Sequence, residues 1–115
     1  MSVTIYHNPR CSKSRQALAL LEKRGIRPRI IEYLVTPPTE AELKSLLKRL
    51  GITPRELLRT KEEEYKKAKL DRPDVTDAEI IRALVKHPRL MERPIVVNGD
   101  KAALGRPPEN VLKII

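Results

Sequence analysis

The first third of the chain alternates strand, helix and strand, and this order constrains the fold more than any other feature. VTIY at 3–6 fits a short strand, and the segment that opens near Cys11 carries apolar residues at helical spacing. Gly25 ends that helix, and RPRIIEYL at 27–34 is rich in β-branched residues, which favours a second strand. Two strands joined through a helical crossover run parallel. Residues 3–34 therefore predict a βαβ unit.

The middle of the chain predicts a helical insertion over about residues 37–88. Its signal is a Thr followed three residues later by Glu, the capping box in which each side chain satisfies a backbone N–H at the start of a helix. The pairs are Thr39 with Glu42, Thr53 with Glu56, Thr60 with Glu63, and Thr76 with Glu79. The second pair is particularly clear because Pro54 follows Thr53, and proline is well suited to the first helical position.

The last quarter predicts a hairpin and a final helix. Pro94–Val97 and Ala102–Leu104 flank Asn98-Gly99, a dipeptide typical of a type I′ turn. Gly105-Arg106-Pro107-Pro108 then leads into the last helix. The whole order is α/β, with a βαβ unit, the helical insertion and a ββα unit. It predicts a mixed four-stranded sheet in a single domain spanning 1–115.

Composition narrows the class of partner. The chain has 24 Lys and Arg against 15 Asp and Glu, a net charge of +9, which suits an anionic partner: nucleic acid, a membrane surface or a small oxyanion. Charge alone does not choose among them. Phe and Trp are absent and there are three Tyr, which argues against stacking on nucleic-acid bases. No segment has the length of a signal-peptide core or a membrane span, so we expect a cytoplasmic protein, without membrane contact and monomeric by default.

Cys11 is the one cysteine, and it is the candidate nucleophile. One cysteine forms neither an internal disulfide nor an all-thiolate metal site, so we expect no metal and a redox cycle that needs an outside thiol. A lone cysteine is often a small buried apolar residue. Here it stands where a strand passes into a helix, and free amides, the helix dipole and nearby cations (Arg10, Lys13, Arg15) should lower its pKa. We expect a partly exposed thiolate beside an anion site.

His7 stands four residues before Cys11 and admits two interpretations. It could share a proton with the site or orient the loop, since histidine titrates near neutral pH. It could equally be a turn histidine bonded to the backbone.

Taken together, these residues resemble a known family, the glutaredoxin-coupled arsenate reductases with one catalytic cysteine. The resemblance covers nearly the whole chain, and the loop HNPRCSKSR at 7–15 is closest to a short bacterial subfamily. Its motifs are Tyr6-His7-Asn8-Pro9-x-Cys11-x-x-Ser14-Arg15, Tyr33-Leu34-x-Thr36-Pro37-Pro38-Thr39, Leu57-Leu58-Arg59, Thr76-Asp77, His87-Pro88, Arg93-Pro94-Ile95-Val96-Val97 and Arg106-Pro107.

The resemblance implies a thioredoxin-like fold, with a cis bond between Arg93 and Pro94. It maps the family's catalytic cysteine to Cys11 and its anion-binding arginines to Arg59, Arg93 and Arg106. We also expect His7 to take part in catalysis and Ser14 and Arg15 to bind the substrate. In the family mechanism the thiolate attacks arsenate, glutathione attacks the adduct, and glutaredoxin resolves the mixed disulfide as arsenite leaves. Glutathione would be a co-substrate, with no tightly bound cofactor.

Three other functions remain open on the sequence. A transcriptional regulator of the Spx type shares this fold and binds RNA polymerase, although such regulators generally carry Cys-x-x-Cys and this chain has Ser14 at the second position. A glutathione-dependent thiol reductase could act on another substrate. Nucleic-acid binding through the net charge ranks last, because no recognisable module accompanies it.

Overall fold

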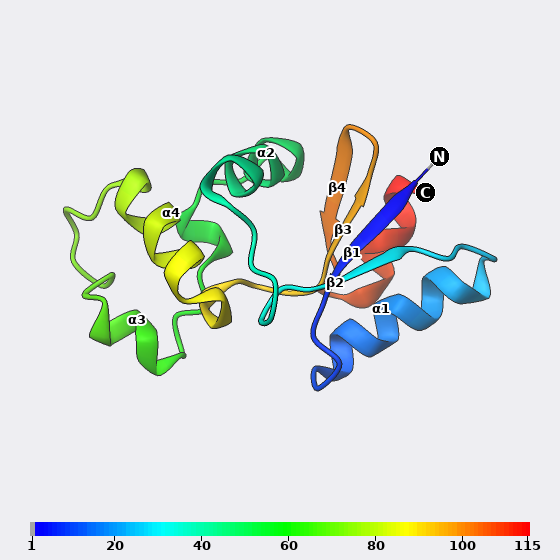
Figure 1. Cartoon of the computed structure of the whole chain (residues 1–115), viewed down its shortest axis with the longest axis horizontal. Coiled ribbons are helices and arrows are strands. Elements are labelled where there is room, and N and C mark those ends of the chain that lie inside the picture. The colour runs from blue at the N-terminus through cyan, green and yellow to red at the C-terminus, as the bar shows by residue number, and fades with distance from the viewer. Residues whose placement is uncertain (1) are drawn as a thin grey trace. The chain divides into compact units, whose positions relative to one another are not determined.

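The computed structural model describes residues 2–115, which divide into two compact units (Figure 1). The first unit combines residues 2–36 with 93–115, and the second comprises 37–92. No helix among the described residues has the length and apolar character needed to cross a membrane.

The first unit contains the sheet. Its strand order is β2-β1-β3-β4, with β1 and β2 parallel and the other two pairs antiparallel, so the predicted mixed four-stranded α/β arrangement is confirmed. The elements are β1 (Val3–His7), α1 (Ser12–Lys23), β2 (Arg29–Glu32), β3 (Ile95–Asn98), β4 (Lys101–Leu104) and the 3-10 helix η3 (Pro108–Ile114).

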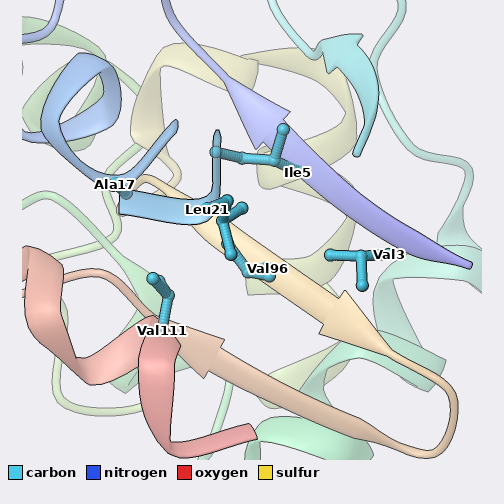
Figure 2. Packing of buried hydrophobic residues seen from close by; sticks show 6 residues of the cluster. All are labelled: Val3, Ile5, Ala17, Leu21, Val96 and Val111. Atoms are coloured by element: carbon cyan, nitrogen blue, oxygen red, sulfur yellow. The ribbon is translucent and has the colours of Figure 1, made fainter. Parts of the chain in front are cut away.

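The core of this unit lies between the sheet and two helices, α1 and η3 (Figure 2). Alternation along β1 sends Val3 and Ile5 to the same face, where they meet Ala17 and Leu21, which are one turn apart on α1. Val96 of β3 and Val111 of η3 complete the cluster. These aliphatic contacts pack α1 and η3 against the sheet.

The second unit is helical, as predicted. It contains α2 (Glu40–Leu50), the 3-10 helix η1 (Arg55–Leu57), α3 (Glu63–Lys67), α4 (Asp77–Lys86) and the 3-10 helix η2 (Pro88–Leu90). The capping boxes at Thr39 and Thr76 form at the starts of α2 and α4. The two helices bury apolar faces and pack against each other, the side chains being Leu43, Leu46 and Leu47 on α2 and Ile80, Ile81 and Leu84 on α4.

Two of the predicted helix starts differ from the prediction. The capping box of Thr53 and Glu56 forms, but the helix that follows it, η1, is only three residues long. It ends there because the backbone of Leu58 is extended and pairs with Met91 in an antiparallel bridge. The short helix expected from Thr60 and Glu63 is present as α3, but it begins at Glu63 with Glu62 as its N-cap, so Thr60 does not cap it. Sequence periodicity could not show that pairing with a distant segment ends the helix early.

The hairpin and the last helix also depart in detail from the prediction. Asn98 pairs with Lys101, so the two turn residues are Gly99 and Asp100 instead of Asn98 and Gly99. Of these two turn residues, Gly99 has a positive φ of 63° and Asp100 does not, which excludes the expected type I′ turn. Asn98 stays in the strand and is buried, where its Nδ2 donates to the carbonyl of Ile114 at 2.6 Å. The final helix is of the 3-10 type throughout.

Candidate active site

Cys11 occupies the N-cap position of α1. Its backbone is extended there (φ −93°, ψ 122°), and its N–H donates to the carbonyl of Asn8 at 3.0 Å. The residue is 9% exposed, so the expected partial exposure was wrong. The reason is that its side chain is turned toward the first amides of α1 and toward Arg93, which enclose it.

These neighbours lower the pKa of the Cys11 thiol. Burial acts first and in the opposite direction, because it disfavours the thiolate. The N–H of Ser14, the charge of Arg93, the N–H of Lys13 and a hydrogen bond from Arg93 outweigh burial and bring the pKa below its usual value. The predicted direction is therefore confirmed, and so is the contribution of the helix N-terminus. The cation responsible is Arg93, whereas we had expected Arg10, Lys13 and Arg15.

Arg93 is held beside the sulfur by the backbone at the start of β3. The Arg93–Pro94 bond is cis, as predicted, and the Arg106–Pro107 bond is also cis, which the sequence did not predict. Arg106 Nε donates to the carbonyl of Arg93 at 2.9 Å, and Gly105 N–H donates to the carbonyl of Pro94 at 2.9 Å. A Cβ on Gly105 would stand 2.6 Å from Pro94 Cγ, so only glycine fits there.

The guanidinium of Arg93 has spare hydrogen-bonding capacity. Among the described residues, its Nε and Nη1 are buried and have no hydrogen-bond partner. Buried donors without partners are rare because leaving them unpaired is unfavourable. A planar guanidinium with two free donors beside a thiolate is suited to a bidentate oxyanion.

His7 and Ser14 form a buried polar pair below the loop. Ser14 is fully buried, its Oγ accepts from the N–H of Asn8 at 3.0 Å, and it lies 2.6 Å from His7 Nδ1. Burial lowers the pKa of His7 below 6.5, against the charge of Glu32, with a smaller lowering from Arg15. A neutral imidazole can accept a hydrogen bond from the Ser14 hydroxyl. His7, the last residue of β1, therefore bonds a side chain, and the expected alternative of a backbone-bonded turn histidine was wrong.

Tyr33 belongs to this cluster and was missed as a site residue in the sequence. It directly follows β2, is 1% exposed, and interacts with Cys11, Arg93, Arg106 and Asn8. Burial raises the pKa of Tyr33 to about 12, aided by the charge of Cys11, while both arginines and a hydrogen bond from the Asn8 side chain oppose the rise. The available signal was its place in the Tyr33-Leu34 motif, one of three Tyr in the chain.

Comparisons with known proteins agree with this site geometry. The family model described as the ArsC family matches residues 6–114. The chain belongs to the ArsC family. It is 55% identical to a protein named arsenate reductase from Haemophilus influenzae, over 100% of both chains, and 52% identical to the uncharacterized protein YfgD of Escherichia coli, over 98% of this chain and 96% of that one. A solved structure titled arsenate reductase from Vibrio cholerae has a TM-score of 0.97 and 52% identity, covering 100% of this chain and 98% of that one. The resemblance seen in the sequence is thus confirmed, together with the fold.

The remaining site residues that we predicted from the sequence have other partners. Arg15 Nη1 donates to the carbonyl of Pro9 at 2.8 Å and so braces the loop. Arg59 lies in the second unit, where its Nη1 is 2.6 Å from Glu62 Oε1, and its role in the site stays a prediction. Across residues 2–115, no three His, Cys, Asp or Glu side chains are grouped so as to hold a metal ion.

Proposed function

We propose that this ArsC family member reduces arsenate to arsenite, with Cys11 as the nucleophile and glutathione and glutaredoxin as the reductants. The observation that carries the proposal is a thiol of lowered pKa that faces two helix amides and a guanidinium with two free buried donors. The Cys11 thiolate and the proposed oxyanion site therefore share one neighbouring side chain, that of Arg93. The names of the relatives, arsenate reductase in Haemophilus influenzae and Vibrio cholerae, support arsenate as the substrate.

The chemistry requires only one cysteine in the chain. The Cys11 thiolate attacks arsenic and displaces an arsenate oxygen as water, which forms an S–As bond. A glutathione thiolate then attacks the Cys11 sulfur, so that an S–S bond forms, the S–As bond breaks and its electron pair stays on arsenic, which leaves as arsenite. Glutaredoxin attacks the glutathione sulfur and frees the Cys11 thiolate. Two thiols thereby supply the two electrons.

The other residues would act on charge and geometry. Arg93 is aimed at the oxygens where negative charge develops, the kind of contact that acts on the barrier. Arg106 supports it through the carbonyl of Arg93. Ser14 and His7 would hold the first turn of α1 in place. Arg106 and Arg59 are proposed as further oxyanion ligands, and Arg59 would have to leave its partner Glu62 to bind. A thiol enzyme of this kind suits the reducing cytoplasm.

The test is an NADPH-coupled assay with arsenate, glutathione and glutaredoxin. Cys11→Ser should remove turnover, and Ser45→Ala, an exposed serine on α2, should retain it. Omitting glutathione or glutaredoxin should each stop the cycle. Arsenate turnover that survives Cys11→Ser would contradict the proposal. Cys11-dependent turnover of another disulfide or oxyanion, without arsenate turnover, would support a different thiol reductase instead, and RNA polymerase capture without turnover would support a regulator.

A further inference from the structure

Tyr33 joins three segments that meet at the candidate site. It follows β2, its side chain is almost fully buried, and it interacts with Cys11 in the loop after β1 and with Arg93 and Arg106 around β3 and β4. A phenol at such a junction is surrounded by groups that must keep fixed positions for the thiol to react.

The contact that links Tyr33 to the loop is the side chain of Asn8. The Asn8 main-chain carbonyl accepts from Cys11 N–H at 3.0 Å, and its N–H donates to Ser14 Oγ at 3.0 Å. Its Oδ1 accepts from Arg10 N–H at 3.0 Å. The parallel register pairs His7 with Glu32, which brings the next residues, Asn8 and Tyr33, beside each other, and the Asn8 side chain hydrogen-bonds the Tyr33 oxygen. Three of these bonds stay within the loop or the first turn of α1. Of these bonds, the one to Tyr33 ties the Asn8 side chain to the segment that follows β2.

We propose that Tyr33 is a positioning residue: by holding the Asn8 side chain, it fixes the loop that places Cys11 at the N-cap of α1. The inference rests on the proposed role of Cys11 as the nucleophile. The lowering of the thiol pKa depends on amides of Lys13 and Ser14 that point at the sulfur, and such hydrogen bonds weaken steeply when the geometry changes. Tyr33 thus acts on the sulfur through Asn8.

The hydroxyl of Tyr33 also stays neutral while it does this. Its pKa is raised to about 12, mainly by burial, so it keeps its proton at neutral pH and adds no negative charge beside the thiolate. A phenylalanine would preserve the packing and remove only the bond to Asn8. This makes Tyr33→Phe a narrow substitution, with little reason for the fold to be lost.

The experiment measures the pH dependence of Cys11 alkylation by iodoacetamide in the full chain. Tyr33→Phe should raise the midpoint by roughly half to one pH unit, the size expected for one hydrogen bond. Asn8→Ala should raise it in the same direction, and the double variant should add little, because both changes break one linkage. Tyr65→Phe in α3 of the second unit is the matched control and should leave the midpoint unchanged.

The outcomes separate this inference from the proposed function. A Tyr33→Phe protein that loses thermal stability but keeps the wild-type midpoint would overturn it, as would additive shifts in the double variant. If Asn8→Ala fails to fold, the comparison of Tyr33→Phe with Tyr65→Phe still decides. Alkylation requires no arsenate, so a raised midpoint supports the inference even if the wild-type chain does not reduce arsenate.

Discussion

The two units of this chain differ in how far their polar groups are paired. In the second unit, residues 37–92, capping boxes close the starts of α2 and α4, and Arg59 pairs with Glu62 and Arg72 with Glu79. In the first unit, α1 begins at Cys11 without a side-chain cap, and Arg93 keeps two buried donors free.

Charge follows the same division. The first unit holds eleven Lys and Arg against four Asp and Glu, a net +7, and the second holds thirteen against eleven, a net +2. Near-balanced charges in the second unit can pair on the helix surfaces. The excess in the first unit gives it a field that attracts anions. The comparison teaches that the first unit, which carries most of the excess positive charge, also keeps unpaired buried donors beside its cysteine, whereas α2 and α4 of the second unit have their first amides capped.

Replacing Arg93 is expected to have the largest effect. Arg93→Ala should lower arsenate turnover by about 10²–10³-fold, because it removes donors directed at developing charge. Stability should change little or rise, since a buried guanidinium with unpaired donors is unfavourable to fold around. Steady-state kinetics and thermal unfolding check both parts, with Arg24→Ala as a control that removes an exposed charge from the same unit. Unchanged turnover would remove Arg93 from the site, and Arg93→Lys should be intermediate.

Removing a cap from the second unit should do the opposite. Thr39→Ala breaks the capping box of α2 and should cost about 1 kcal/mol of stability. The pKa of Cys11 should not move, because the groups that lower it all lie in the first unit. The chain has no Trp, so urea unfolding is best followed by circular dichroism, and Ser45→Ala in the same helix serves as the control. A shifted alkylation midpoint in Thr39→Ala would show that the division between the units is less sharp.

The smallest expected effect concerns His7 and pH. Its pKa in the folded chain is lowered by burial, so below about pH 6.5 the unfolded chain takes up a proton that the folded chain resists. This contribution to stability is complete above that pH and is lost as the pH falls through the folded-state pKa. His7→Gln should therefore lose less stability than the wild type between pH 7.5 and 5.5, by a few degrees in Tm at most. An equal loss in both proteins would show that His7 accepts its proton freely in the fold.

The sequence predicted the order of the elements because that order depends on local chemistry. The βαβ unit, the capping boxes at Thr39 and Thr76 and the antiparallel pair around Gly99 were all correct, since caps, turns and side-chain periodicity involve residues a few positions apart. The motifs also identified the family. The capping box at Thr53 also formed, but the sequence did not predict how short the helix after it is, because a bridge between Leu58 and the distant Met91 ends that helix.

The sequence by itself determined that one cysteine would sit at a helix N-terminus with a lowered pKa, because both follow from a strand, a loop and a helix in succession. Only the tertiary structure decided which cation does the lowering, how deeply the sulfur is enclosed, and that Tyr33 stands beside it. Arg93 and Tyr33 reach Cys11 because β1, β2 and β3 are neighbours in the sheet. Residue spacing along the chain does not predict which strands are neighbours, because hydrogen bonds between strands and the packing of α1 on the sheet determine that order.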